Sequence, residues 1–395
     1  MHTSQRQIFL NHVGQTSDFP MLLEIEKASG IYLTDIYGKK YVDLVSGVSV
    51  SNLGHSHPAV VEAVIQQAQN YMHLMVYGEY VQSPQTQFAK LLTSLLPDTL
   101  NSVYFVNSGS EATEGAMKLA KRYTGRTQMI CMRNAYHGST HGALSVCGNE
   151  DFKNSFRPLL PDIQIIDFNN LAHLQNITTK TACVIAECLQ AEGGAILPQN
   201  DYLIKLKQRC VETGALLIID EIQTGFGRSG SLFAFEQFGF VPDILLIAKA
   251  MGGGMPIGAF VADKKIMDVF KTNPILGHIT TFGGHPVSAA AAYASLKYLV
   301  DNDVVKDVNR KGGLFRKNLE NHPKILEIRG MGLFYAVELG SFDRVQQFIK
   351  NLIQNGAVTD WFLFHDTAFR IAPPLIITED EITQTCEIIT KSLDF

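Results

Sequence analysis

The sequence predicts an α/β fold: a large, mostly parallel sheet with helices on both faces, joined to a smaller α+β domain. Five short runs in the middle of the 395-residue chain are apolar throughout, as expected for strands covered on both faces. Segments with helical periodicity separate them, which is the pattern of repeated βαβ units. The runs are 103–106, 129–132, 183–186, 216–219 and 244–247.

The two ends of the chain have a different pattern. Residues 30–35 and 40–44 flank a turn at 37–39, which predicts an antiparallel hairpin. The C-terminal part mixes helical patterns with strands such as 333–338, so we expect both ends to share the smaller domain. The predicted division is an N-terminal segment over 1–50, a large domain over 51–295 and a C-terminal part over 296–395.

Composition excludes several classes of protein. Lys and Arg number 33 against 38 Asp and Glu, giving a net charge of −5, and no basic block suggests a nucleic-acid surface. No apolar run reaches membrane-spanning length, and the N-terminus has no apolar signal core. The six cysteines form no CxxC pair or metal-like cluster. We therefore expect a cytoplasmic protein with reduced, buried thiols and no metal site.

Polar or glycine-rich residues follow all five apolar runs. In open α/β sheets the ligand site lies outside the carboxyl ends of the strands. One strand can end in polar residues simply because it reaches the surface, but five such ends favour a shared site. The residues are Asn107-Ser108-Gly109-Ser110, Tyr136-His137-Gly138, Glu187, Asp220-Glu221 and Ala248-Lys249.

Lys249 directly follows an apolar strand and precedes glycines at 252–254. Burial lowers the pKa of an amine, and a neutral amine is a nucleophile suited to Schiff-base formation. The glycines would let the backbone lie close to a flat cofactor. Taken alone, the lysine could also be structural, with its ammonium group reaching water.

Two further features suit a charged cofactor. Asp220, if ionised, could hold a protonated pyridine nitrogen, which then acts as an electron sink; it could instead cap a helix or bind a metal. Ser108 and Glu111 have the spacing of a capping box. The helix that would begin at Gly109 and Ser110 offers free N–H groups to a phosphate.

The remaining candidates have both a functional and a structural interpretation. Tyr136 could stack on the cofactor or be a core tyrosine. Gln223 could bond a phenolic oxygen, and the segment 280–284 offers hydroxyls and amides to a phosphate. Arg370, a lone cation in an apolar segment, could bind a substrate carboxylate through two parallel hydrogen bonds or form a structural ion pair.

Together these motifs resemble those of class III aminotransferases, within the fold type I family of pyridoxal-phosphate (PLP) enzymes. The segment 220–228, followed by a lysine at the spacing of Lys249, is the most specific part of the resemblance. The similarity runs over nearly the whole chain. Its other motifs lie at 43–47, 53–58, 107–112, 136–138, 187–194, 248–254, 281–286 and 370–374.

The resemblance implies a role for each matching residue. Lys249 resembles the Schiff-base lysine and Asp220 the partner of the pyridine nitrogen; both would be catalytic. Thr281 resembles the phosphate ligand that this family donates across a dimer interface, which implies a homodimer with shared active sites. The full cofactor-binding set is Ser108, Gly109, Ser110, Tyr136, His137, Glu187, Asp220, Gln223, Lys249 and Thr281.

On the substrate side, Arg370 is similar to the arginine that grips the substrate carboxylate, and Glu192 to the glutamate that pairs with it until a dicarboxylate arrives. Ser139 stands where ornithine, acetylornithine and 4-aminobutyrate enzymes commonly carry an arginine, and Val48 where ornithine aminotransferases carry a tyrosine. Ala191 replaces a usual glycine. One carboxylate anchor is therefore missing, although length and motifs are closest to the acetylornithine-type branch.

We therefore predict a PLP-dependent aminotransferase that moves an amino group from an amine or amino acid to a 2-oxo acid, 2-oxoglutarate or pyruvate, by a ping-pong mechanism. Lys249, once free, would carry the proton as general base and acid. The alternatives are a PLP-dependent aminomutase or decarboxylase, and a catalytically silent binding protein with the same fold. A nicotinamide-dependent oxidoreductase would need a Gly-x-Gly-x-x-Gly turn after an early strand, which the sequence lacks.

Overall fold

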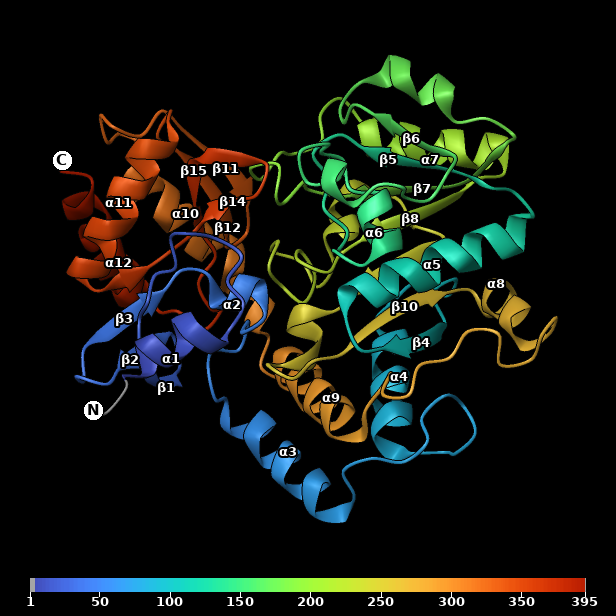
Figure 1. Cartoon of the computed structure of the whole chain (residues 1–395), viewed down its shortest axis with the longest axis horizontal. Coiled ribbons are helices and arrows are strands. Elements are labelled where there is room, and N and C mark those ends of the chain that lie inside the picture. Colours follow the sequence, from blue (N-terminus) through green and yellow to red (C-terminus); the bar gives the residue numbers. More distant parts are fainter. Residues whose placement is uncertain (1–3, 395) are drawn as a thin grey trace.

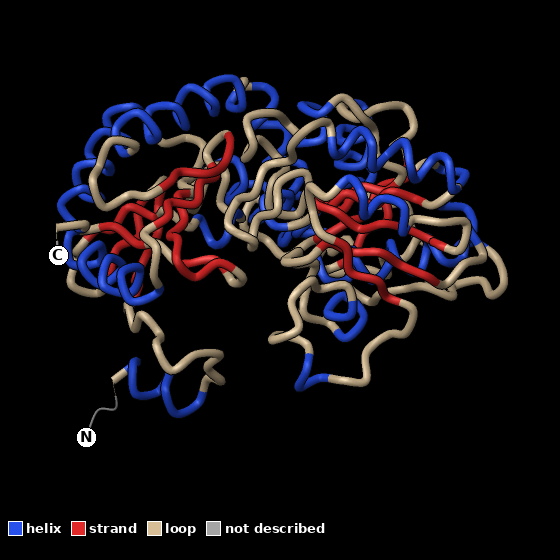
Figure 2. The backbone as a smooth tube through the Cα atoms, turned by 90° about the horizontal axis from the view of Figure 1, so that it is seen from above, coloured by secondary structure: helices blue, strands red, loops and turns tan. Residues whose placement is uncertain are grey.

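The computed structural model describes residues 4–394 and gathers the strands into two groups. One group is a seven-stranded sheet, and the other consists of two four-stranded sheets (Figures 1 and 2). In Figure 1 the large sheet lies on the right, and the blue N-terminal and red C-terminal segments lie together on the left. The expected α/β architecture with a smaller α+β part is therefore confirmed.

The large sheet has the order β4-β10-β9-β8-β7-β5-β6. β10 runs antiparallel to both of its neighbours, and the other adjacent pairs are parallel. All five predicted strands are present, while β6 and β10 were not predicted. β10 has the sequence GAFVA, whose small residues give little local preference for a strand, so its position between two strands decides its conformation. The strands are β4 (Ser102–Val106), β5 (Gln128–Met132), β6 (Ile163–Ile166), β7 (Thr181–Glu187), β8 (Leu216–Asp220), β9 (Ile244–Ile247) and β10 (Gly258–Ala262).

Both faces of this sheet are buried under helices. Along β8, Ile218 joins a core that contains Leu119 of α5, whereas Ile219 joins a second core that contains Leu206 of α7 and Leu296 of α9. Successive side chains of a strand point to opposite faces, so a strand between two cores must be apolar at every position. This is why the central runs lack alternation. The helices span Gly109–Thr124 (α5), Tyr202–Thr213 (α7) and Pro286–Asp301 (α9).

The smaller part joins both ends of the chain. The predicted hairpin is present as β2 and β3, and β13 from the C-terminal part pairs with β3 in parallel. The expected boundary at 295/296 falls inside α9, and the domain limits remain a prediction. The strands are β1 (Ile25–Ser29), β2 (Tyr32–Asp35), β3 (Lys40–Asp43), β11 (Glu327–Met331), β12 (Phe334–Glu338), β13 (Ala357–Val358), β14 (Trp361–Phe362) and β15 (His365–Ile371), and the helices are α10 (Val308–Leu319), α11 (Phe342–Asn355) and α12 (Glu379–Ser392).

A short left-handed turn follows β3. All four residues of α2 (Ser46–Ser49) have positive φ angles, including Val48 at φ 61° and ψ 57°. A β-branched residue is strained in this conformation, so the surroundings must hold it. Asp43 Oδ1 accepts hydrogen bonds from the N–H groups of Val45 and Ser46, and Ser46 Oγ donates to the carbonyl of Ala372 at 2.7 Å. The turn therefore connects the N-terminal segment to the strand end that follows Arg370.

The remaining helices differ in how deeply they are buried, since α6 buries four of its five residues. α1 buries none of its residues and lies at the periphery of the molecule (Figure 2). Between residues 4 and 394, no helix is long and apolar enough to cross a membrane. All six cysteines are buried and unpaired, as expected. The helices are α1 (Gln5–His12), α3 (Pro58–Asn70), α4 (Ser83–Ser94), α6 (His141–Ser145) and α8 (Lys264–Met267).

Candidate active site

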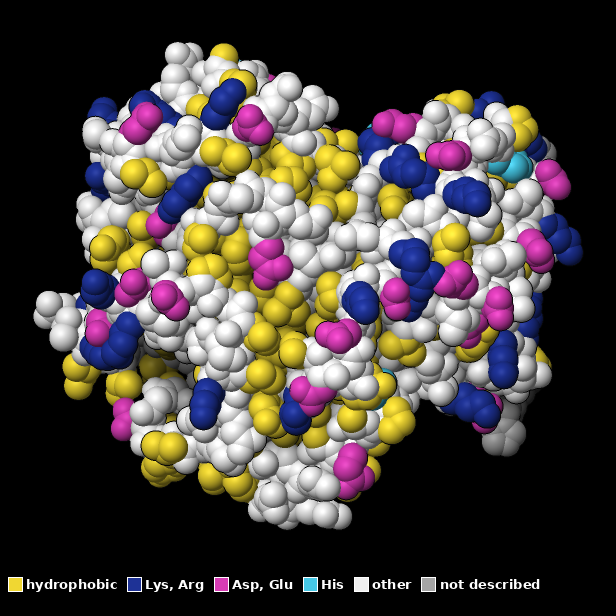
Figure 3. Space-filling view, turned by 180° about the vertical axis from the view of Figure 1, so that it is seen from behind, with side chains coloured by type: hydrophobic (Ala, Val, Ile, Leu, Met, Phe, Trp, Pro, Cys, Tyr) yellow, Lys and Arg dark blue, Asp and Glu magenta, His cyan; other side chains and the backbone are white. Residues whose placement is uncertain are grey.

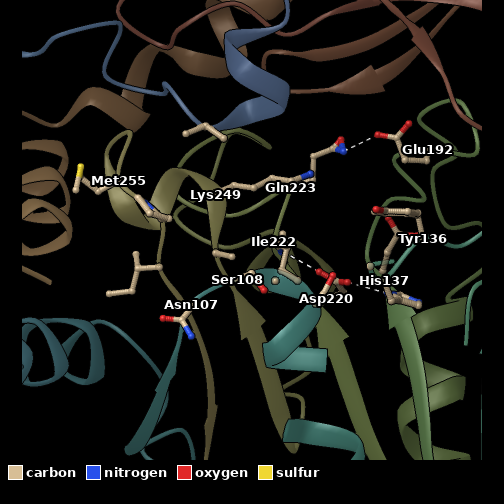
Figure 4. A pocket seen from close by; sticks show the side chains of 18 of the residues that line it. Asn107, Ser108, Tyr136, His137, Glu192, Asp220, Ile222, Gln223, Lys249 and Met255 are labelled. Carbon is tan, nitrogen blue, oxygen red and sulfur yellow. Dashed lines mark hydrogen bonds and ion pairs between the residues drawn. The ribbon is translucent and has the colours of Figure 1, made fainter. Parts of the chain in front are cut away.

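A pocket of about 420 Å³ lies outside the carboxyl ends of the large sheet, where the strand-end residues predicted it (Figure 4). The predicted residues that line it are Ser108, Gly109, Ser110, Tyr136, His137, Glu187, Glu192, Asp220, Gln223 and Lys249. The apolar part of the wall consists of Val50, Ile222, Ala248, Met255, Pro256 and Ile257, of which sequence reasoning had named only Ala248. Ile222 lies inside the 220–228 motif, but a motif does not by itself show which of its side chains face a pocket.

Lys249 begins the turn directly after β9 and has a positive φ of 48°. Its side chain extends across the pocket toward Gln223 (Figure 4). Burial lowers the pKa of Lys249 from its ordinary value, and the negative charge of Glu192 offsets this only in part. A lowered pKa increases the neutral, nucleophilic fraction of the amine at neutral pH.

Asp220 is held at the end of β8 by two hydrogen bonds. Oδ2 lies 2.7 Å from Nδ1 of the buried His137, and Oδ1 accepts the N–H of Ile222 at 2.9 Å. An ionised carboxylate can only accept, so Nδ1 is the donor in this pair. Thr113 in α5 fixes the same loop by donating its hydroxyl hydrogen to the carbonyl of His137. The carboxylate therefore has a fixed orientation, as a partner for a protonated ring nitrogen requires.

The N-terminus of α5 forms an anion site beside these residues. Ser108 Oγ accepts the N–H of Glu111 at 3.2 Å, which is one half of the predicted capping box. The other half differs, because the Glu111 carboxylate accepts the backbone and side-chain N–H groups of Asn107 instead of the Ser108 N–H. The N–H groups of Gly109 and Ser110, in the first turn, have no intrahelical acceptor and can bind a phosphate.

Glu187 lies beside Asp220, because the two residues are register partners in β7 and β8. Its Oε1 accepts the N–H of Ala191 at 3.0 Å, whereas its buried Oε2 has no hydrogen-bond partner. Burial, followed by the charge of Asp220, raises the pKa of Glu187 well above its usual range. The raised pKa favours the uncharged form of this carboxyl group in the wall of the pocket.

The predicted pair of Arg370 and Glu192 is in contact. Arg370 Nη2 lies 3.1 and 3.2 Å from the two carboxylate oxygens of Glu192. Gln223 bridges the pair, donating to Glu192 at 2.8 Å and accepting from Arg370 at 3.1 Å. Burial would raise the pKa of Glu192, but the positive charges of Arg370 and Lys249 outweigh it and lower that pKa.

Asp360 is a second carboxylate on Arg370 that sequence reasoning missed. Its Oδ1 lies 2.9 Å from Arg370 Nε, whereas Glu192 contacts Nη2 of the same guanidinium. The signal is indirect: β14 and β15 are antiparallel, with Trp361 opposite Phe369, so the preceding Asp360 comes opposite Arg370. Arg370 is buried behind Glu192 and Gln223, and only the latter two line the pocket.

Besides Arg370, three more predicted residues do not line the pocket. Thr281 is exposed on the surface of this single chain. Val48 points elsewhere from its left-handed turn, and Val50 lines the pocket in its place. Ser139 is also exposed, and its hydroxyl lies 2.9 Å from the hydroxyl of the pocket residue Tyr136.

The donor set fits PLP. The helix start can take a phosphate, Asp220 can pair with a ring nitrogen, and the Lys249 amine lies in the same pocket with its pKa lowered. The backbone is packed closely around this cradle, since a Cβ added at Gly138 would lie 2.2 Å from Ser110 Oγ. Of the residues from 4 to 394, no group of three His, Cys, Asp or Glu side chains could hold a metal ion. Fold and site together define a PLP-dependent enzyme of fold type I.

The family follows from comparison with known proteins. The sequence model of "Aminotransferase class-III" matches residues 13–393, so the chain belongs to that family and is an enzyme that transfers amino groups with PLP. An acetylornithine aminotransferase of Methanopyrus kandleri is 36% identical, over 97% of this chain and 96% of its own length. A [LysW]-aminoadipate semialdehyde/glutamate semialdehyde transaminase of Sulfurisphaera tokodaii is 34% identical, over 94% and 95%.

Solved structures of two kinds of transaminase share the fold. The ornithine aminotransferase of Toxoplasma gondii has a TM-score of 0.91 and 30% identity, covering 99% of this chain and 94% of its own. An (S)-enantioselective omega-transaminase of Thermomicrobium roseum has a TM-score of 0.91 and 25% identity, covering 98% and 97%. The names of these relatives refer to different substrates, so the family alone does not fix the donor.

Proposed function

We propose that this enzyme moves an amino group from a primary amine to a 2-oxo acid, 2-oxoglutarate or pyruvate, in two half-reactions at one site. When bound, PLP supplies the electron sink for the substrate carbon. The observation that carries the proposal is the shared pocket of Lys249, Asp220 and Gln223, with Arg370 directly behind it. Each residue contributes a separate function.

Lys249 would hold the cofactor through its Nζ and, once free, would move a proton to and from the substrate carbon. Asp220, oriented by His137, keeps the ring nitrogen protonated, and Tyr136 covers the ring. Gly109 and Ser110 bind the phosphate. Three more side chains, Ser108, Glu187 and Gln223, complete the cofactor site.

Arg370 binds the carboxylate of the acceptor after Glu192 turns away. The support is geometric: Glu192 contacts both Arg370 and the pocket, so its movement would expose the guanidinium to a substrate. Asp360 stays beside Arg370 Nε and prevents the guanidinium from losing all of its counter-charge in that movement.

The functional unit is a homodimer in which Thr281 of each chain reaches the phosphate of its partner. In support, large apolar side chains are exposed on two neighbouring segments near Thr281, including Val81 (93% exposed) and Ile275 (74% exposed). The ring contact between His73 and Phe282 joins these segments. Apolar side chains also gather over the face seen in Figure 3. The free, buried thiols support a cytoplasmic location.

The first test replaces Lys249 with alanine. The expected result is a loss of amino transfer on the order of 10³-fold or more, because the variant lacks both the nucleophile and the proton carrier. The measurement follows the visible absorbance of the bound cofactor and the appearance of the new amino acid. Lys180→Ala, at an exposed lysine, is the matched control. Wild-type rates of amino transfer in Lys249→Ala would contradict the proposal. If the unmodified enzyme converts an amine without passing its amino group to the oxo acid, an aminomutase or decarboxylase is favoured.

The second test concerns the dimer. Val81→Asp places a charge on the exposed apolar surface, so we expect dissociation to monomers and weaker cofactor binding, measured by sedimentation and by cofactor titration. Val211→Asp is the control, because this valine is also exposed but lies in α7, away from this surface. It should change neither the oligomeric state nor cofactor binding. A wild-type protein that sediments as a monomer with full activity would contradict the shared site.

A further inference from the structure

We infer that the amino donor is a primary amine whose far end is apolar or aromatic, without a carboxylate, and that Tyr136 and Phe364 bind that far end. The inference rests on the proposed function and names its donor. It follows from the charges around the pocket, from the residue at position 139, and from an aromatic cluster that spans two parts of the molecule.

The lining of the pocket disfavours a second anion. Its carboxylates include Glu192 and Asp220, and among the described residues Lys249 is its single lysine or arginine. Lys249 is needed for the cofactor, whose phosphate adds further negative charge. A carboxylate at the far end of a donor would lose its hydration here without gaining a cation, which is strongly unfavourable.

Two buried basic residues outside the lining already have partners. Arg370 contacts Glu192 and Asp360. Lys153 is buried, and its Nζ donates to the carbonyls of Ser145 and Cys147 at 3.2 and 3.0 Å. Because these cations are neutralised or bound to backbone, a donor carboxylate would have to displace one of them.

Position 139 presents a hydroxyl group beside the pocket. Ser139 follows Gly138, a residue of the pocket wall, and its Oγ lies 2.9 Å from the Tyr136 hydroxyl. The exposed position of Ser139 places the hydroxyl end of Tyr136 toward the surface. Tyr136 therefore extends from the pocket outward, and the group that meets its outer end is neutral.

An aromatic cluster, the aromatic wall, begins at Tyr136 and extends beyond the lining of the pocket. The ring of Phe364 lies 6.4 Å from the ring of Tyr136, and the half-exposed Phe152 packs edge-on against Phe364 at 5.0 Å. Phe364 belongs to the hairpin between β14 and β15, in the smaller part of the molecule. Rings at these separations attract one another and offer apolar surface to a ligand.

Glu192 fixes this hairpin against the pocket. Its carbonyl accepts the N–H of Phe364 at 3.0 Å, and its carboxylate accepts the N–H of Leu363 at 3.1 Å. The residue that covers Arg370 therefore also holds the aromatic wall. A donor without a carboxylate can use this arrangement as it stands, since nothing in it requires Glu192 to move.

The overall reaction balances without another reactant. The donor R–CH₂–NH₃⁺ loses its C–N bond and becomes the aldehyde R–CHO, while the 2-oxo acid exchanges its carbonyl oxygen for the amino group. The one water molecule used to release the aldehyde is formed again when the oxo acid takes up the amino group. The acceptor carboxylate uses Arg370, and the donor uses the aromatic wall.

The experiment compares donors that differ in one carboxylate. Holoenzyme is mixed with pentylamine, 5-aminopentanoate, 2-phenylethylamine or N-acetylornithine, and the visible absorbance of the cofactor gives kcat/KM for the donor half-reaction. We expect pentylamine and 2-phenylethylamine to react at least 10-fold more efficiently than the two carboxylates. Ser139→Arg should narrow or reverse the preference between pentylamine and 5-aminopentanoate, because it adds a cation next to Tyr136.

Variants of the hairpin test the aromatic wall. Phe364→Ala should raise KM for 2-phenylethylamine about 10-fold, while the return half-reaction with the oxo acid keeps its rate. The KM of Phe364→Leu should lie between those of the unmodified enzyme and Phe364→Ala. Leu363→Ala removes an exposed apolar side chain from the same hairpin and should change neither half-reaction.

The failures of this inference and of the proposed function can be distinguished. If 5-aminopentanoate or N-acetylornithine reacts as well as pentylamine, the donor inference is wrong and amino transfer itself stands. The same holds if Phe364→Ala leaves the KM for 2-phenylethylamine unchanged. If no donor converts the cofactor, including alanine and glutamate, the proposed function is wrong.

Discussion

The cofactor half and the substrate half of the pocket are built in different ways. Glu187, Asp220 and Lys249 stand at or just after the ends of β7, β8 and β9, three adjacent strands of one sheet. Arg370 and Glu192 are 178 residues apart and come from the smaller part of the molecule and from a loop of the larger part. The common chemistry therefore rests on one rigid sheet, whereas substrate choice rests on how two parts of the chain meet.

The strongest test of this contrast is Asp220→Asn. The amide cannot hold a protonated ring nitrogen, so we expect both half-reactions to slow by roughly 10²–10⁴-fold, the range for a positioned charged group. His137→Gln should cost less, about 10-fold, because it removes only the residue that orients Asp220. Stopped-flow absorbance with an amine and with an oxo acid measures both halves. An effect confined to one substrate would contradict a role at the cofactor.

Arg370→Lys should affect one half-reaction only. A lysine retains the charge but loses the parallel pair of hydrogen bonds, so we expect KM for the oxo acid to rise about 10–100-fold. The kcat/KM of the half-reaction with a carboxylate-free amine should change less than about 3-fold. Steady-state kinetics at several acceptor concentrations separates the two values. Equal losses in both half-reactions would mean that Arg370 is structural.

The smallest expected effect concerns the strained turn at Ser46–Ser49, which is bonded to the strand end after Arg370. Val48→Gly removes the clash of a β-branched residue at φ 61°, and after the entropy cost of glycine we expect a gain of about 0.5–1 kcal/mol. Thermal unfolding should show a rise in Tm of roughly 1–2 °C. Val61→Gly in α3 is the control and should destabilise, because that valine lies in a helix. A lower Tm for Val48→Gly would show that the packing of Val48 outweighs its strain.

Sequence reasoning succeeded where a site residue lies within a few positions of a recognisable strand end. The ends of the apolar runs placed Ser108, Asp220 and Lys249 in one pocket, because parallel strands bring their carboxyl ends to one edge. It failed where contacts depend on strand order or on hairpin register. β10, inserted antiparallel between β4 and β9, and Asp360, opposite Arg370, are examples.

The sequence by itself determined the family, the cofactor and the residues that suit the chemistry, because each of these is carried by a local motif with fixed spacing. The tertiary structure alone decided the surroundings of the substrate. It placed two carboxylates on Arg370, put Val50 rather than Val48 in the wall, and brought Phe364 beside Tyr136. The physical reason is that charge neutralisation and ring packing act through space, between segments whose separation along the chain carries no signal.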